Sequence, residues 1–420
     1  MRLTILHTND IHGRQERIAQ IATIVERERA SSDHTVLYLD AGDVEETTNL
    51  LSNVTKGAAM HRLLSVAGCD AATVGNACWL RYGPGPLTEH ARVSSYPQLL
   101  ANFTGIDGPV PSVLLGEIGI VGVTDPFESM ANDLDWGFGR LEVLETARAA
   151  ARDLRSRGAK LVVLLSHLGY AHGLPPWDDR RIAPELQDDV DVIIGAHSHD
   201  LLPEGEWIGR ILVAQAGCYG DHIGRIEIDG DQRVASVETV PDDTGLHPGV
   251  LTEATQIEAE IEQLLAEPLG SLDAPLDAHA IAEILRARAG ADVALFSEGQ
   301  TVAVLPPGPV TRGDLWHASE SGANPAVTRM TGEQVLELLE RGNRPDVQRE
   351  TPRPLRGRPR GRLELAGPLP EAGREYVVAG TDWELEPYGG YVPEDWRLRI
   401  EYEFPLIVRE AIEERLRGGS

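Results

Sequence analysis

Short apolar runs that end in polar side chains recur along the first half of the chain, and this pattern limits the possible folds more than any other feature. Five such runs lead into the residues Asp10, His12, Asp43, Asn76, His167, His197 and His199. Apolar residues at helical spacing, for example over 17–29, separate the first two runs. Apolar strands that alternate with amphipathic helices predict a layered α/β domain with a buried sheet.

The length of the chain indicates more than one domain. A chain of 420 residues exceeds the size at which a single hydrophobic core usually stops growing. The sequence loosens into "PDDTGLHPG" from Pro241, and an amphipathic helix follows around Ile257. We therefore predict a first domain over 1–240, a linker with a connecting helix over 241–268, and a second domain over 269–420.

Charge and cysteine content limit the possible binding partners of the protein and its possible cellular location. The chain has 66 acidic and 38 basic residues and a net charge of −28, which disfavours binding to a nucleic-acid backbone. No run of about 18 apolar residues could span a membrane, and the first residues do not read as a secretory signal. Three cysteines do not form a disulfide framework. These features predict a cytoplasmic protein without a membrane partner, and they leave its oligomeric state open.

The polar residues at the ends of the apolar runs have both ordinary and functional interpretations. Taken singly, an Asp or Asn after a strand is usually a turn or cap residue, and a lone His is usually a hydrogen-bonded structural residue. Taken together, they lie where open α/β sheets bind ligands. Carboxylate, carboxamide and imidazole donors suit Mn, Fe or Zn, and seven donors are too many for one tetrahedral ion. We therefore predict two divalent ions that share one carboxylate.

The ordered motifs resemble a known family. The segments "NDIHG", "DAGD", "AATVGN", "SHLG" and "GAHSH" are similar to those of the calcineurin-like metallophosphoesterases, and their spacing resembles the bacterial 5'-nucleotidase branch. The segment "PPGPVTRGDLWHASESGANPAVTRMTGEQVLELLE" resembles the C-terminal substrate domain of that branch. The resemblance implies a four-layer αββα sandwich followed by a second α/β domain that binds substrate.

The resemblance also implies the ligand set and the reaction. One ion would be held by Asp10, His12 and His199, the other by Asn76, His167 and His197, with Asp43 as the bridge. A hydroxide bridging the ions would attack a phosphate ester, most simply a small nucleotide. No catalytic residue is evident beyond this hydroxide.

One departure from the family lies directly after Asn76. The family has a His and, three residues later, an Asp, where this chain has Ala77 and Leu80. The His is credited with stabilising the transition state or protonating the leaving group, and positioned acid catalysis contributes about 10² to 10⁴ in rate. We considered Cys78 and His172 as replacements, but packing and a solvated loop are the favoured interpretations of these two residues.

This departure leaves one predicted function and two alternatives. We predict a nucleotidase-like hydrolase with altered specificity. The first alternative is a hydrolase of esters with good leaving groups, such as aryl esters or pyrophosphates, or a relative of the thiosulfohydrolases, which also lack this His. The second alternative is a metal-binding sensor with little turnover.

A second departure lies in the C-terminal domain. The family commonly has an Asn-Gly-Gly-x-Arg loop where this chain has "SEGQ", and Glu298 in that loop would repel a phosphate unless another charge intervened. The later segment "GTDWELEPYGGYV" resembles the family's base-binding loop. It predicts Trp383, Tyr388 and Tyr391 as stacking residues, although aromatic residues in the core or at its rim are an equally good interpretation.

Overall fold

The computed structural model describes residues 1–77, 79–126, 137–171, 177–319, 321–344 and 360–418. The chain forms two compact units, Met1–Ala259 and Glu260–Ser420. The division falls within helix α9 (Pro248–Leu265). The predicted two-domain α/β architecture is thus confirmed. Within the described residues, no helix combines the length and the apolar character needed to cross a membrane.

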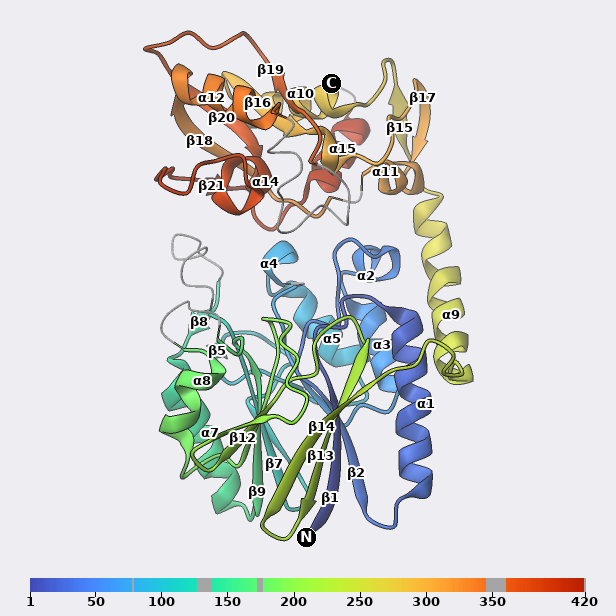
Figure 1. Cartoon of the computed structure of the whole chain (residues 1–420). Coiled ribbons are helices and arrows are strands. Elements are labelled where there is room, and N and C mark those ends of the chain that lie inside the picture. Colours follow the sequence, from blue (N-terminus) through green and yellow to red (C-terminus); the bar gives the residue numbers. More distant parts are fainter. Residues whose placement is uncertain (78, 127–136, 172–176, 320, 345–359, 419–420) are drawn as a thin grey trace. The chain divides into compact units, whose positions relative to one another are not determined.

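Two six-stranded sheets form the centre of the first unit (Figure 1). The first sheet has the order β14 (Gln232–Thr239), β13 (His222–Asp229), β1 (Arg2–Thr8), β2 (Thr35–Asp40), β3 (Ala71–Thr73), β4 (Gln98–Leu99). The second has the order β11 (Glu206–Ile208), β12 (Ile211–Ala214), β10 (Val192–Gly195), β9 (Leu161–His167), β7 (Ile118–Thr124), β6 (Ser112–Leu115). Strands β1 to β4 are parallel, as are β12, β10, β9 and β7. Parallel strands end at one edge of each sheet.

Helices cover the outer faces of both sheets in the first unit (Figure 1). Those beside the first sheet are α1 (Gln15–Ser31), α3 (Ala58–Val66) and α5 (Gly85–Val93), while α2 (Leu50–Val54) contacts α3 and α4 (Trp79–Tyr82) contacts α5. Those beside the second sheet are α7 (Val143–Ser156), α8 (Asp179–Ile182) and the 3-10 helix η1 (Ala183–Leu186). A small pair, β5 (Phe103–Thr104) and β8 (Gly139–Arg140), completes the unit. The predicted four-layer αββα sandwich is confirmed.

The alternating directions of the side chains along β9 show how the sequence produces these layers. Leu161, Val163 and Leu165 belong to the apolar core between the two sheets. Val162 and Leu164 point the other way and belong to the core beneath α7. Successive side chains of a strand face opposite sides of a sheet, so a strand covered on both sides must be apolar throughout.

The second unit has its own sheet and core. Its five-stranded sheet has the order β19 (Leu363–Ala366), β16 (Val293–Ser297), β20 (Glu375–Thr381), β18 (Pro325–Thr331), β21 (Glu401–Tyr402), and β15 (Pro268–Leu272) pairs with β17 (Gly308–Thr311). Its helices are α10 (Ala278–Ala289), α11 (Arg312–Ala318), α12 (Gly332–Gly342), α14 (Asp382–Leu385), α15 (Val408–Gly418), and the 3-10 helices η2 (Glu298–Gln300) and η3 (Pro387–Gly389). Thr311 and Thr331 begin α11 and α12 with reciprocal capping hydrogen bonds.

Candidate metal centre

The seven predicted ligands lie at the ends of strands or in the loops that follow them, in both sheets of the first unit. The loops after β1, β2 and β10 carry five ligands with positive φ angles of 48° to 70°, Asp10, His12, Asp43, His197 and His199. Within the described part of the chain, Lys56 and Tyr219 are the other non-glycine residues with this conformation. Left-handed backbone is uncommon outside glycine, and such strain gathers at functional sites. The backbone of these loops therefore sets the direction of the ligand side chains.

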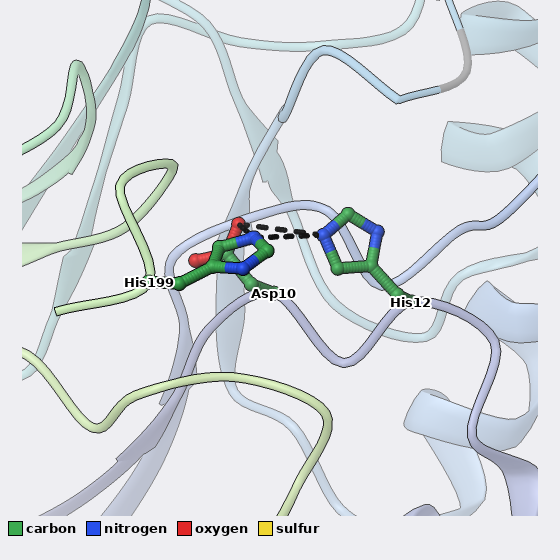
Figure 2. A group of neighbouring side chains, drawn as sticks. All are labelled: Asp10, His12 and His199. Carbon is green, nitrogen blue, oxygen red and sulfur yellow. Dashed lines mark hydrogen bonds and ion pairs between the residues drawn. The ribbon is translucent and has the colours of Figure 1, made fainter. Parts of the chain in front are cut away.

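Asp10, His12 and His199 form the first group of donors (Figure 2). Asp10 Oδ1 lies 3.8 Å from His12 Nε2 and 3.4 Å from His199 Nε2, and the two imidazole nitrogens are 3.1 Å apart. The other carboxylate oxygen of Asp10 accepts hydrogen bonds from the Asn9 side chain at 2.8 Å and from the backbone N–H of His197 at 2.9 Å. These bonds fix the buried carboxylate so that Oδ1 faces both histidines.

Asn76, His167 and His197 form the second group. Asn76 Oδ1 lies 3.0 Å from His167 Nε2 and 2.9 Å from His197 Nδ1. The distal Nδ1 of His167 is 2.8 Å from the carbonyl oxygen of Ala41. Because a carbonyl only accepts, Nδ1 carries a proton whether or not the ring is charged, and the neutral ring would present a lone pair at Nε2. This arrangement is usual for a histidine that binds a metal.

Asp43 lies between the two groups. Its Oδ2 is 4.0 Å from His12 Nε2 and 3.3 Å from His167 Nε2. Its Oδ1 accepts a hydrogen bond of 2.8 Å from the backbone N–H of Ala77. One carboxylate therefore faces a member of each group, as a bridging ligand must.

The buried charges of the centre require compensation. Burial alone would lower the pKa of His167, but the neighbouring Asp43 carboxylate raises it to about 10. Burial likewise opposes protonation of His199, whose pKa is raised to about 10 by Asp10 and Cys218. Without another cation, protonated imidazoles supply the positive charge for these carboxylates. Two divalent ions would supply it instead, and the oxygen and nitrogen donors suit them.

The position after Asn76 contributes its backbone but no acidic side chain. Ala77 is half-buried, and its methyl group has no proton to donate. Trp79 is buried and packs edge-on against Phe103 and Phe138, with ring centroids 5.7 Å and 6.0 Å away. Cys78, His172 and the side chain of Leu80 lie outside the described residues.

Two residues that sequence reasoning missed border the first group. Tyr219 lies 5.7 Å from His12 and 5.6 Å from His199 between ring centroids, and the Arg14 guanidinium lies 5.1 Å above its ring. The Cys218 thiol contacts His199. Both residues belong to a loop after β12 that has no motif of its own, so their sequence carried no signal of this position.

The predicted stacking residues of the C-terminal domain have different environments. Tyr391 is fully buried and its hydroxyl donates to the carbonyl of Arg360 at 3.3 Å, so in this conformation it packs in the core instead of presenting a face to a ligand. Trp383 is half-buried, and the side chain of Tyr388 lies outside the described ones. Glu298 forms an ion pair of 3.0 Å with Arg362, which supplies the intervening charge that a phosphate would need near this loop.

Comparison with known proteins defines the class of the molecule. The model of the calcineurin-like phosphoesterases matches residues 3–201, and the model of the 5'-nucleotidase C-terminal domain matches residues 273–357. The chain therefore belongs to the calcineurin-like phosphoesterases, a family of phosphoester hydrolases, in the branch that carries a 5'-nucleotidase C-terminal domain.

Individual relatives are distant. An uncharacterized metallophosphoesterase of Bacillus subtilis (strain 168), YunD, is 27% identical over 367 residues, which cover 80% of this chain and 77% of that protein. The 5'-nucleotidase of Bos taurus is 25% identical over 278 residues, which cover 55% of this chain and 47% of that protein. The chain thus spans about half the length of the bovine relative, and only 27% of the trifunctional nucleotide phosphoesterase YfkN of B. subtilis.

Solved structures show the same fold. A 5'-nucleotidase precursor from Thermus thermophilus superposes with a TM-score of 0.61 at 21% identity, covering 100% of this chain and 96% of that one. The sulfate thiohydrolase SoxB of T. thermophilus superposes with a TM-score of 0.59 at 17% identity, covering 99% and 94%. At such identities the likeness establishes the architecture.

Proposed function

We propose that this chain is a hydrolase of phosphate esters that depends on two divalent metal ions, Mn, Fe or Zn. The observation that carries the proposal is the convergence of seven oxygen and nitrogen donors, with the Asp43 carboxylate between two groups of three. In this proposal one ion binds Asp10, His12 and His199, the other binds Asn76, His167 and His197, and Asp43 bridges them.

The ions and the protein chain would have different roles in the proposed reaction. When bound, two ions in such a site supply Lewis acidity toward water and toward the oxygens of a phosphoryl group. The chain orients their ligands through bonds made at the far side of each group: the N–H of His197 to Asp10, the N–H of Ala77 to Asp43, and the ring of His167 to a carbonyl. Such outer contacts typically contribute 10-fold to 100-fold in metal affinity or activity.

The favoured substrate is a small nucleotide or another phosphate ester with a good leaving group. Relatives named 5'-nucleotidase and the matched C-terminal domain support the nucleotide. The methyl group of Ala77 supports the restriction on the leaving group, because position 77 offers no acid to protonate a departing alkoxide. The same feature supports a second candidate, a sulfur-containing ester with a thiol-like leaving group, as the fold shared with a sulfate thiohydrolase permits.

The test compares metal-dependent turnover in matched variants. The chain is purified with Mn²⁺ and assayed on aryl phosphates of graded leaving-group pKa, nucleoside monophosphates, pyrophosphate and a thiosulfate ester. Asp43→Ala removes the bridge, and Asp243→Ala, an exposed Asp of the same unit, is the control. We expect turnover in wild type and control, its loss in Asp43→Ala, and a steep fall in rate as leaving-group pKa rises. Equal rates in wild type and Asp43→Ala would reject hydrolysis at this centre, and metal binding without turnover would favour a sensor.

A further inference from the structure

A second group of potential ligands lies in the first unit, apart from the seven donors described above. Glu45 follows β2, His61 belongs to α3 and His90 belongs to α5, and their exposures are 5%, 4% and 0%. Glu45 Oε1 lies 2.6 Å from His61 Nε2 and 3.5 Å from His90 Nδ1. One donor atom from each of the three residues lies within 4.8 Å of the others. The three side chains therefore converge on one buried point.

The outer nitrogen of each imidazole has hydrogen-bond partners. His90 Nε2 lies 2.6 Å from the carbonyl oxygen of Lys56, and His61 Nδ1 lies 2.8 Å from the hydroxyl of Tyr96 and 3.0 Å from the amide nitrogen of Gln98. A histidine that binds a metal characteristically has its distal N–H held by an acceptor, as the Lys56 carbonyl holds that of His90, which turns the lone pair of the other nitrogen toward the ion. The inner nitrogens of both rings face Glu45.

The contact between His90 and Glu45 favours a bound cation. Because the Lys56 carbonyl only accepts, Nε2 of His90 carries the proton of the neutral ring. Its Nδ1 then directs a lone pair toward the Glu45 carboxylate oxygen 3.5 Å away, and both groups are buried. A cation between these two atoms would be attracted by both of them.

The backbone is fitted closely around the group. A side chain at Gly57 would place its Cβ 2.8 Å from Glu45 Cγ and 2.8 Å from the ring of His90. The φ angle of Gly57 is +95°, which side chains rarely tolerate. The loop between α2 and α3 can thus pass closely over the side chains of Glu45 and His90.

We propose that Glu45, His61 and His90 bind a third divalent ion, for which zinc is the best match. One carboxylate and two imidazoles are a common zinc ligand set, and the fourth position would be filled by water. This ion would tie the chain after Asp43 to α3 and α5 and would stabilise the fold from behind the bridging residue. The proposal does not depend on hydrolysis, since a structural ion needs no substrate.

Metal counting on the full chain tests the proposal. Purified protein is saturated with Zn²⁺, freed of excess by gel filtration and analysed by mass spectrometry of the metal. We expect three equivalents in wild type and in the control His279→Gln, whose side chain is exposed, and two in Glu45→Gln and in His90→Gln. An unchanged count in both variants would overturn the proposal.

A second variant keeps the test decisive if Glu45→Gln and His90→Gln fail to fold. Asp10→Ala combined with Asn76→Ala removes one ligand from each group of the candidate dimetal centre and leaves Glu45, His61 and His90 intact. This protein should retain one zinc equivalent and, with Co²⁺ in its place, show the visible absorption of a tetrahedral site with nitrogen and oxygen ligands. Retention of no metal would refute the third site, whatever the outcome of the hydrolysis assays.

Discussion

Gly75 offers a test of how the backbone positions the carboxylate of Asp43, the proposed bridge between the two ions. A Cβ added at this position would lie 2.1 Å from Asp43 Oδ1 and 2.3 Å from the Asp43 nitrogen. Real Cβ atoms essentially never approach within 3.0 Å, so one partner must move by about 0.9 Å to relieve the carboxylate contact alone. Gly75 is not among the glycines with positive φ, so alanine adds this clash without the strain of a left-handed backbone.

The size of this displacement sets the expected effect of Gly75→Ala. Metal ligands hold their distances to within about 0.2 Å, and a misplacement of about 1 Å can lower a catalytic rate about 100-fold. Because Asp43 faces both groups of donors, its displacement affects both proposed ions. We expect metal affinity to fall about 10-fold to 100-fold, which corresponds to about 1.4 to 2.8 kcal/mol, with a similar or larger loss of turnover.

The assay pairs Gly75→Ala with a matched glycine in the same unit. A Cβ at Gly85 meets nothing within 4 Å, so Gly85→Ala should keep wild-type behaviour. Metal affinity is measured by competition with a chromogenic chelator, turnover with an aryl phosphate, and folding by circular dichroism. If folded Gly75→Ala matched wild type in affinity and rate, the assignment of Asp43 as the bridge would be wrong.

Three further predictions concern other parts of the chain. Ala77→His with Leu80→Asp should restore an acid and raise turnover of alkyl esters more than that of aryl esters; a rise equal for both would count against a missing acid. Burial lowers the pKa of His7 to about 4, so between about pH 6.5 and pH 4 the unfolded chain binds a proton at this residue that the folded chain does not. As pH falls through this window, wild type should therefore lose about 3 kcal/mol of stability relative to His7→Phe in urea titrations, and parallel profiles would contradict this prediction. Glu298→Gln breaks an exposed ion pair with Arg362 and should change the free energy of unfolding by less than about 1 kcal/mol. The KM for an anionic ester should fall, because Arg362 loses the carboxylate that neutralises it. A large drop in thermal midpoint or an unchanged KM would oppose this account.

The architecture and the convergence of the predicted ligands could be read from the sequence for one physical reason. Parallel strands buried on both faces are apolar throughout, as Val162 and Val163 of β9 illustrate by facing different cores. Polar residues directly after such strands must then meet at one edge of the sheet. The positions of Asp10 and Asn76 relative to their strands therefore carried spatial information that composition alone lacked.

Other features depend on contacts that no local pattern encodes. Glu298 and Arg362 are 64 residues apart and pair only because β16 lies beside β19. The burial of Tyr391 follows from packing around Arg360, not from its own glycine-rich segment. Left-handed angles at Asp10 and His199 likewise follow from how the loops close, although short polar residues tolerate them better than most.

The environment of Ala77 shows why metal binding and proton supply could vary independently at the proposed centre. The N–H of residue 77 donates to Asp43 Oδ1, and any residue other than proline can provide that bond. A positioned acid for a leaving group, in contrast, needs a side chain that carries a proton, and alanine has none to give. In the proposed centre an alanine here therefore keeps the Asp43 carboxylate oriented while it supplies no acid. We therefore expect the dependence of rate on leaving-group pKa to reflect the absence of this acid, because the orientation of Asp43 is the same for every substrate.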